Sequence, residues 1–393
     1  MEKMKKIFYN KQYLDSGDFS EVLNSMKQKL ITTGPYIDKL EKSIQRKLDV
    51  KYALTCSSGT SAIFLALKSI DLKKNDVIIM PAINFIASAN AATILGAKIY
   101  LADIDYESGQ MTPSTLNKCI QNNKLKKIKA VVTMYLGGRP NNAIEFYKIK
   151  KRYKFKLIED SCHALGARYH HNKKDYMVGC SKHCDISTFS LHPVKSITAG
   201  EGGIITTNNL SIFKRLKILR SHGMDRSNNV KNKYWNYDIL LPSLNFRLSD
   251  INAALAYSQL KKLDKFIKNR NESAHLYCEK LRELNNYITT TTLEKKITSA
   301  CHLMVILINF KKLKIDKDKL IKLLINKKIY CQYHYIPIYK FSIYKHLKNK
   351  EKFINSEKFY HNALSLPLYY DMSQKILLTI VSEIKKILTK YGK

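Results

Sequence analysis

Short apolar runs alternate with longer stretches of helical periodicity between about residues 50 and 245. The apolar runs are VIIMP (77–81), KIYLADI (98–104), AVVTMYLGG (130–138), KLIED (156–160), DISTFSL (185–191) and GGIITT (202–207). Helix-like stretches such as 61–70 and 142–153 separate several of them. Strands that alternate with helices are typical of a mostly parallel sheet covered on both faces. The pattern therefore predicts an α/β fold with a large domain built on a mostly parallel, mixed sheet.

After Ser249 the pattern changes to a long helical periodicity. Apolar side chains then recur at Ile251, Ala254, Leu255, Leu260, Leu263 and Ile267, which predicts a long helix that could bridge two domains. Beyond it we expect a strand at 301–310, a helix at 316–328, a strand at 329–335 and a helix at 374–388. These elements predict a smaller α+β domain, against which the first ~35 residues would fold back. We place the N-terminal segment and large domain at residues 1–248, and the linking helix and small domain at 249–393.

The composition is that of an ordinary globular protein. Hydrophobic residues make up 45% of the 393 residues and charged residues 25%. No apolar run approaches the ~20 residues of a membrane span, and the basic start lacks the apolar stretch of a secretion signal. We therefore expect a cytoplasmic protein without a membrane partner. The eight cysteines are scattered, so reduced thiols are expected, and the cluster CSKHC (180–184) lacks the second pair that a zinc site needs.

The formal net charge of +36 raises the question of nucleic-acid binding. The lysines, however, are spread along the whole chain, and no helix-turn-helix, zinc-finger or RNA-recognition signature is present. A dispersed positive charge can equally steer small anionic molecules toward a site. A basic nucleic-acid-binding or regulatory protein therefore remains only as a remote alternative, and we expect no nucleic-acid partner.

Three motifs are expected to meet at one edge of the predicted sheet. In TCSSGTSAIFLAL, hydroxyls and free N–H groups between a strand and a helix could cradle an anion or simply cap the helix. In KLIEDSCHALGARY, Asp160 and His163 follow a buried strand, where open α/β sheets form their ligand crevice. Lys195 lies 35 residues beyond Asp160, after the next strand and before a glycine-rich turn. An acid at such an edge could be an ion-pair partner, a metal ligand or the partner of a ring nitrogen.

An amine, a carboxylate and an anion cradle at one edge are what pyridoxal phosphate requires. The amine of Lys195 would hold the aldehyde as a Schiff base, and the carboxylate of Asp160 would keep the pyridine nitrogen protonated. A flat ring also favours an aromatic partner, and Phe85 in PAINFIASAN is a candidate. The convergence therefore favours pyridoxal 5′-phosphate as the cofactor, with no metal.

Five ordered motifs make the resemblance explicit. The segments SSGTSA, PAINFIASAN, EDSCHALGA, FSLHPVKSITAGEGG and LNFRLSDINAALAYSQLKKLD resemble the DegT-type sugar-nucleotide aminotransferases, which are fold-type-I pyridoxal-phosphate enzymes. The resemblance implies that Lys195 carries the cofactor and moves the proton, with Asp160 at the pyridine nitrogen and His163 close to the ring. It also implies that Phe85 stacks on the ring. The residues that would hold the phosphate are Ser58, Gly59, Thr60 and Ser190.

The same resemblance implies a homodimer with shared active sites. Asn245 matches an asparagine that such enzymes lend to the neighbouring subunit's cofactor phosphate. The family usually has glycine two residues earlier, where this chain has Ser243 followed by Leu244, so the loop could be shaped differently. Relatives that dehydrate sugars replace the lysine with histidine, and the presence of Lys195 favours amino transfer.

Further segments resemble the aminotransferases of pseudaminic acid biosynthesis, which aminate C4 of a UDP-linked 4-keto-6-deoxy-N-acetylhexosamine. They are EVLNSMKQKLITTG, LRSHGM, QYHYIPIYKFSIYKH and FYHNALSLP. The resemblance implies substrate contacts from Tyr9, Lys29, Thr32, His334 and Tyr335. It also implies L-glutamate as the amino donor and a ping-pong mechanism. A dTDP- or GDP-linked 4-keto sugar is the alternative, and these aromatic residues could also be surface residues of a tyrosine-rich chain.

Overall fold

The computed structural model describes residues 6–226, 235–290, 297–348 and 352–393. The α-helices are α1 (Ser16–Met26), α2 (Pro35–Leu48), α3 (Gly59–Ser69), α4 (Ala87–Ile94), α5 (Pro113–Asn122), α6 (Ala143–Tyr153), α7 (Leu210–Arg220), α8 (Asp250–Lys261), α9 (Leu263–Leu281), α10 (Lys317–Asn326), α11 (Ile354–Asn362) and α12 (Gln374–Tyr391). The strands are β1 (Tyr52–Cys56), β2 (Val77–Pro81), β3 (Lys98–Ala102), β4 (Ala130–Met134), β5 (Lys156–Asp160), β6 (Arg168–His171), β7 (Lys174–Met177), β8 (Ile186–Ser190), β9 (Gly203–Thr207), β10 (Met224–Asp225), β11 (Asp238–Ile239), β12 (Ile288–Thr290), β13 (Ile297–Thr298), β14 (Met304–Ile308) and β15 (Ala363–Leu366).

A seven-stranded sheet forms the centre of the large domain. Its strand order is β1-β9-β8-β5-β4-β2-β3. The neighbours from β8 to β3 pair in parallel, whereas β9 runs antiparallel to both β8 and β1. The sheet is therefore mixed and mostly parallel, as the alternation of strands and helices predicted.

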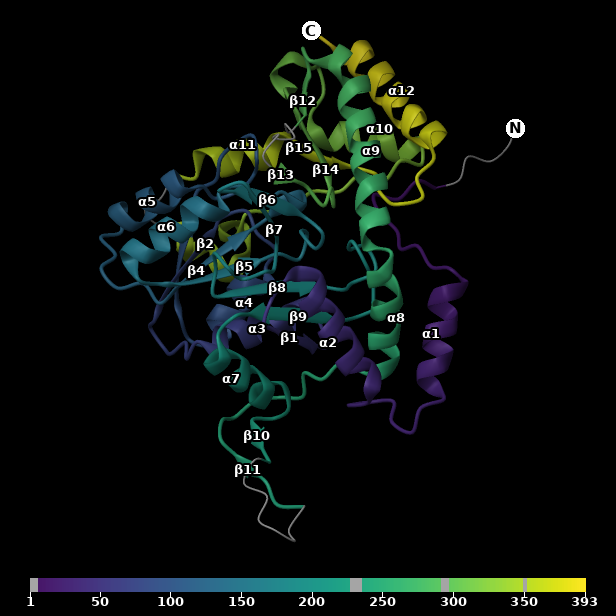
Figure 1. Ribbon diagram of the computed structural model, residues 1–393. Helices are drawn as coiled ribbons and strands as arrows, with labels where there is room; N and C mark the ends of the chain where they lie inside the picture. The colour runs from purple at the N-terminus through teal and green to yellow at the C-terminus, as the bar shows by residue number, and fades with distance from the viewer. Residues whose placement is uncertain (1–5, 227–234, 291–296, 349–351) are drawn as a thin grey trace.

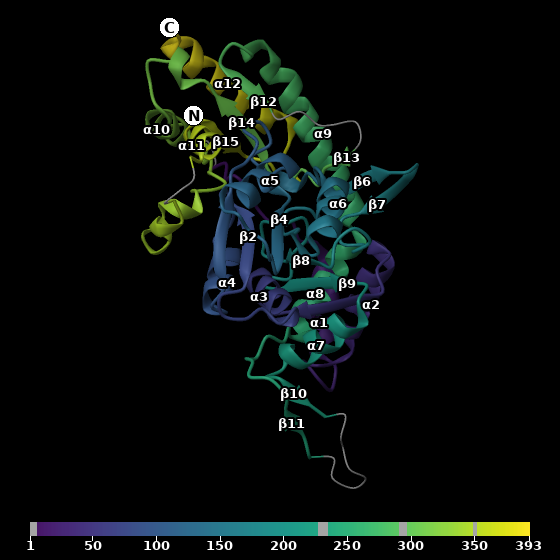
Figure 2. The ribbon, with the colours of Figure 1, turned by 90° about the vertical axis from the view of Figure 1, so that its left-hand side faces the viewer.

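Helices cover both faces of this sheet. Helices α3, α4 and α7 pack in one hydrophobic core, and α2 and α8 pack in the core of the opposite face. Figure 2 shows α4 and α2 on opposite sides of strands β8 and β9. Both faces are buried, so the parallel strands consist of nearly continuous apolar residues, as in Val131 and Val132 of β4.

The predicted long helix connects the two parts of the molecule. It is formed by α8 and α9, which meet at Lys262, and Figure 1 shows it running from the large sheet to the small domain. Helix α8 packs against α1 and α2, whereas α9 packs against α12 beside the antiparallel sheet β12-β14-β15. The N-terminal segment contacts the small domain through Ile7, which bridges Ile329, and α1 then lies along α8. Helix α9 thus packs in both cores, through Leu263 and Phe266 in the large one and through Tyr277 and Leu281 in the small one.

Two sequence expectations about strands are wrong. The run at 130–138 is a strand only to Met134, because Gly137 and Gly138 take left-handed φ values of 70° and 89° and turn the chain. The segment 329–335 is not a strand, since its backbone bonds go to three different places. The Ile329 N–H bonds to Leu324, the Tyr330 N–H to Ile7, and the Gln332 N–H to Ser365. This segment is therefore a loop, although its composition is typical of a strand.

Within the residues that the structure describes, no helix combines the length and apolarity needed to cross a membrane. The eight cysteines form no disulfide.

The two acids at the end of β5 face opposite sides of the sheet, because side chains alternate along a strand. Glu159 is 3% exposed and accepts hydrogen bonds from Tyr135 Oη at 2.6 Å and Ser187 Oγ at 2.8 Å. Burial raises the pKa of its carboxyl group. Glu159 therefore satisfies two buried hydroxyl groups, and its neighbour Asp160 faces away from them.

Replacing Glu159 with alanine should destabilise the fold without altering the other face of the sheet. Glu159→Ala leaves the Tyr135 hydroxyl unpaired and Ser187 with only the weak contact of its Oγ to Cys184 Sγ at 3.2 Å, so we expect the free energy of unfolding to fall by about 3 kcal/mol. Glu159→Gln keeps the volume and an acceptor, and we expect it to cost less than about 1 kcal/mol. Urea unfolding of the two variants beside the unmodified protein measures both values. Equal stabilities for alanine and glutamine would contradict the structural role.

Candidate active site

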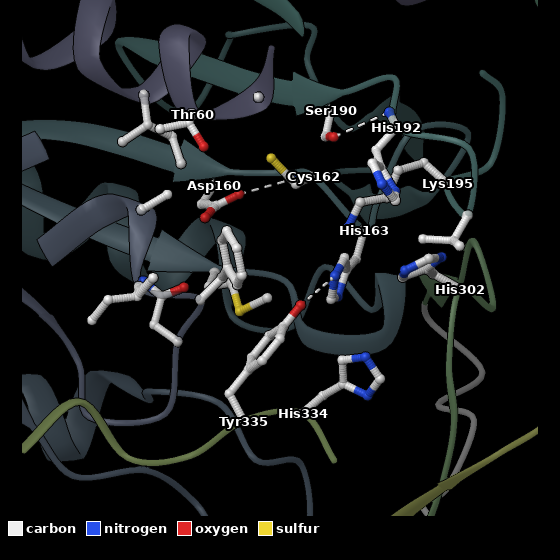
Figure 3. Close-up of a pocket in the computed structure, with 18 of the residues that line it drawn as sticks. Thr60, Asp160, Cys162, His163, Ser190, His192, Lys195, His302, His334 and Tyr335 are labelled. Carbon is white, nitrogen blue, oxygen red and sulfur yellow. Dashed lines mark hydrogen bonds between the residues drawn. The ribbon is translucent and has the colours of Figure 1, made fainter. Parts of the chain in front are cut away.

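A cavity of about 660 Å³ opens at the carboxyl ends of β5 and β8, between the large and small domains (Figure 3). Most of the predicted site residues line it, namely Tyr9, Ser58, Gly59, Thr60, Phe85, Asp160, His163, Ser190, Lys195, His334 and Tyr335. They come from the N-terminal segment, the large domain and the segment before β15. The structure thus brings together the three motifs that the sequence placed at one sheet edge.

Asp160 and Lys195 provide opposite charges in this cavity. Asp160 ends β5 and is 2% exposed, and its Oδ1 accepts a hydrogen bond of 3.2 Å from the Cys162 N–H. Burial raises the pKa of this carboxyl group, and the nearby charge of Lys195 opposes that rise. Lys195 lies in the turn after β8, where its N–H bonds to the His192 carbonyl at 2.9 Å. Burial lowers the pKa of its amine, so less of it is protonated at neutral pH than for a surface lysine.

The N-terminus of α3 forms the anion cradle. Ser58 caps the helix by accepting a hydrogen bond from the Ser61 N–H at 3.0 Å, and the N–H groups at Gly59 and Thr60 belong to the first turn, which lacks intrahelical partners. A Cβ atom at position 59 would lie only 2.7 Å from Cβ of Ser190. Glycine therefore allows the positive end of the helix dipole to lie directly beside the Ser190 hydroxyl.

Aromatic and imidazole rings form the wall between the two domains. The His163 ring is buried, with Nδ1 3.4 Å from the Gly137 N–H and Nε2 2.9 Å from the Tyr335 hydroxyl. Burial lowers the pKa of this imidazole well below its usual value, so the ring is neutral. The ring centroid of Phe85 lies 5.7 Å from that of Tyr335. These rings enclose the cavity as expected of a site for a flat molecule.

The small-domain side of the cavity is formed by Tyr9 and the segment containing His334. The two ring centroids are 5.6 Å apart, and His334 Nδ1 lies 2.8 Å from Ser365 Oγ. Burial lowers the pKa of His334 to about 3, so this imidazole is neutral too. The loop that replaces the expected strand therefore places neutral polar rings opposite Asp160 and Lys195.

Three predicted residues lie outside the cavity of this chain. Lys29 and Thr32 lie in the segment between α1 and α2, where Thr32 bridges Ser249. Asn245 bridges Ser221, and its Oδ1 accepts a hydrogen bond of 3.1 Å from the Arg247 N–H. Their assigned roles in cofactor and substrate binding remain predictions.

The sequence reasoning missed several residues of the cavity wall. Asn84 is 1% exposed, and neither atom of its amide has a partner among the described residues. It directly precedes Phe85 in the quoted motif and could have been found there. Cys162 was likewise within a quoted motif. His302 lies just before β14, and its ring centroid is 4.2 Å from that of His163. No local signal distinguishes it, because its position depends on domain packing.

The residues present fit pyridoxal phosphate. The buried carboxylate of Asp160 offers an anionic partner for a protonated ring nitrogen, and the Lys195 amine lies in the same cavity. The close approach of Gly59 and Ser190 forms a cradle that a Cβ atom would fill. The unpaired amide of Asn84 adds a polar group that a bound molecule can satisfy. Donor set and shape thus both match this cofactor.

Comparisons with known proteins agree with this chemistry. Residues 12–385 match the model of the DegT/DnrJ/EryC1/StrS aminotransferase family. The chain is 34% identical to the UDP-4-amino-4,6-dideoxy-N-acetyl-beta-L-altrosamine transaminase of Campylobacter jejuni subsp. jejuni serotype O:23/36, over 97% of this chain and 99% of that one. The solved structure of PseC from Helicobacter pylori, an aminotransferase involved in the biosynthesis of pseudoaminic acid, superposes with a TM-score of 0.89 at 30% identity, covering 98% of this chain and 100% of PseC.

A third relative bears on the cofactor. The PMP-form of a putative sugar aminotransferase, Spr1654 from Streptococcus pneumoniae, has a TM-score of 0.88 at 25% identity and covers 98% of this chain and 99% of its own. The family match spans both domains and every motif around the cavity. The chain therefore belongs to the DegT/DnrJ/EryC1/StrS aminotransferase family and is a pyridoxal-phosphate-dependent sugar aminotransferase.

Proposed function

We propose that this enzyme transfers the amino group of L-glutamate to C4 of a UDP-linked 4-keto-6-deoxy-N-acetylhexosamine. The observation that carries the proposal is that Asp160 and Lys195 share one cavity with Tyr9, His334 and Tyr335, the residues assigned to the sugar from sequence. The whole-length similarity to the C. jejuni transaminase supports the same substrate class. The net charge of +36 would favour the approach of an anionic nucleotide diphosphate.

Asp160, Lys195, Ser190 and the first turn of α3 each have a definite task in this proposal. The cofactor, when bound, supplies an aldehyde that takes up the amine and a ring that withdraws electrons from the carbon losing its proton. Asp160 would stabilise the positive charge of the ring nitrogen, and the first turn of α3 with Ser190 would bind the phosphate. Lys195 accepts and returns the proton at the reacting carbons, for which the pKa lowered by burial suits it.

The overall reaction would proceed in two half-reactions at one site. L-glutamate first gives up its amino group and leaves as 2-oxoglutarate. The 4-keto sugar then accepts the amine at C4 and leaves as the amino sugar, which is a ping-pong sequence. Because both substrates use the same cavity, the small-domain wall must leave room for both a dicarboxylate and a sugar.

An assay with labelled glutamate tests the substrate directly. The purified enzyme is incubated with L-[¹⁵N]glutamate and, separately, with UDP-, dTDP- and GDP-linked 4-keto-6-deoxy sugars. We expect ¹⁵N at C4 of the UDP-linked sugar, with one 2-oxoglutarate formed per amine transferred. A higher kcat/KM for the dTDP- or GDP-linked sugar would replace the proposed substrate with the alternative. No transfer to any of the three would contradict the proposal.

We also propose that the active enzyme is a homodimer. Helix α1 and the residues after it expose large apolar side chains at Phe19, Leu23, Met26, Leu30 and Ile31, each at least half exposed. Apolar patches of this kind on a globular protein mark interaction surfaces. Lys29 and Thr32 lie in the same region, which would bring them toward a neighbouring active site. Light scattering should give twice the mass of the chain, and a monomer would contradict the proposal.

A further inference from the structure

The hydrogen bonds around His163 determine which ring nitrogen carries the proton. The Gly137 N–H donates to Nδ1 at 3.4 Å, so Nδ1 must be an unprotonated acceptor. A neutral imidazole has one N–H group, and burial keeps this imidazole neutral. The proton therefore lies on Nε2, which faces the Tyr335 hydroxyl at 2.9 Å (Figure 3). His163 must donate this hydrogen bond, and the Tyr335 oxygen accepts it.

This assignment leaves the proton of the Tyr335 hydroxyl available to another acceptor. No acceptor for it is found among the protein groups that the structure describes. Burial raises the pKa of the phenol, so Tyr335 keeps this proton over the physiological range and can donate but not act as a base. The side chain lines the same cavity as Asp160 and Lys195. Tyr335 is thus a donor that is oriented by the protein and lacks a protein acceptor.

We propose that Tyr335 donates a hydrogen bond to the ketone oxygen of the sugar, and that His163 orients the phenol for this task. The inference rests on the proposed function, because it assumes a keto sugar in this cavity. As the incoming amine forms its bond to the carbonyl carbon, the C=O double bond opens and the oxygen gains negative charge. Overall the oxygen leaves as water with the two hydrogens of the amine, so Tyr335 retains its own proton. A preoriented donor stabilises the charge on this oxygen where water is excluded.

Neighbouring groups are less suited to the same task. The His334 ring is held only through Nδ1, 2.8 Å from Ser365 Oγ, and a hydroxyl can donate or accept, so no backbone N–H determines its protonated nitrogen as one does in His163. Asp160 is an acceptor when ionised and cannot stabilise negative charge. Lys195 is needed for proton transfer at the carbon. Tyr335 therefore combines an orientation set by His163 with a free proton, whereas the free amide of Asn84 has no protein partner that orients it.

The two half-reactions separate this role from a structural one. The glutamate half-reaction creates its ketone, that of 2-oxoglutarate, only in the final release by water. The earlier absorbance change of the cofactor, measured in a single turnover, therefore follows steps in which no ketone oxygen is present. Tyr335→Phe should retain close to the unmodified rate in that half-reaction. Its kcat for amination of the keto sugar should fall by about 10²-fold, as when one oxyanion donor is removed. Equal losses in both half-reactions, or no loss in either, would overturn the proposal.

A matched control and an independent readout complete the test. Tyr330→Phe removes a hydroxyl five residues earlier in the same segment, where the ring stacks on Phe8 at 5.4 Å outside the cavity, and both rates should be unchanged. Nitrogen NMR of the ¹⁵N-histidine-labelled protein, assigned with His163→Gln, should show His163 protonated on Nε2 alone. A proton on Nδ1 would overturn the assignment whatever the activity. The kinetic test uses whichever 4-keto sugar the enzyme aminates, so failure of the UDP-linked substrate is distinguished from failure of the role of Tyr335.

Discussion

Lys195→Ala should abolish amino transfer. The substitution removes both the amine that binds the cofactor and the base that moves the proton, so we expect kcat to fall by at least about 10⁴-fold. No other lysine lines the 660 Å³ cavity, among the residues that the structure describes. Incorporation of ¹⁵N from labelled glutamate into the sugar measures the loss.

Chemical trapping tests the same assignment without relying on turnover. Borohydride reduction of the unmodified protein loaded with cofactor should attach the cofactor covalently to the peptide containing Lys195. This cofactor label should be absent from Lys195→Ala. Lys74→Ala removes an exposed lysine outside the cavity and serves as the control that keeps full labelling and activity. A label on a different lysine, or an unmodified protein that takes up no cofactor, would contradict the assignment.

Asp160→Asn should be the second most damaging change. Asparagine has nearly the shape of aspartate but carries no charge, so it cannot keep the ring nitrogen protonated. We expect kcat to fall by about 10²–10³-fold, which is typical of losing one preorganised electrostatic group. The cofactor should also dissociate faster, because a charge-assisted hydrogen bond is replaced by a neutral one. Stopped-flow measurement of the glutamate half-reaction and cofactor retention after dialysis test the two effects.

The neighbouring acid provides a control on the same strand. Glu159→Gln makes the same chemical change one residue earlier, on the side of β5 that faces Tyr135 and Ser187. We expect it to retain its cofactor and turnover, with at most a small loss of stability. If Asp160→Asn were as active as Glu159→Gln, the carboxylate of Asp160 would have no role at the ring nitrogen.

The strand-and-helix pattern of the large domain was accessible from sequence because both signals are local. The apolar runs at 77–81 and 156–160 are β2 and β5 at the predicted bounds, and the periodicity after Ser249 is the helix pair α8 and α9. In a parallel sheet, every strand carries its following motif to the same edge. Asp160 and Lys195 were therefore predictable as neighbours before any coordinates were available.

The expected strand at 329–335 shows where local signals are insufficient. Its aromatic and β-branched residues favour a strand, but a strand needs one continuous partner for its backbone groups. Here these groups bond to Ile7 from the N-terminal segment, to Leu324 of α10 and to Ser365 of β15. Leu324 lies only five residues before Ile329, but Ile7 lies 323 residues before Tyr330 and Ser365 lies 33 residues after Gln332, so the local composition contains no information about these two partners.

The sequence by itself determined the α/β class, the amine, the carboxylate and the anion cradle, because each depends on residues near one another in the chain and on the shared polarity of parallel strands. The resemblance also pointed to Tyr9, His334 and Tyr335, but only the tertiary structure decided how these residues and His302 assemble opposite that edge. The wall of Tyr9, His302, His334 and Tyr335 comes from segments that meet only when the small domain packs on the large one. The orientation of Tyr335 by His163, on which the proposed contact with the ketone oxygen rests, joins residues 172 positions apart. Such contacts follow from domain packing, which no local pattern of side chains encodes.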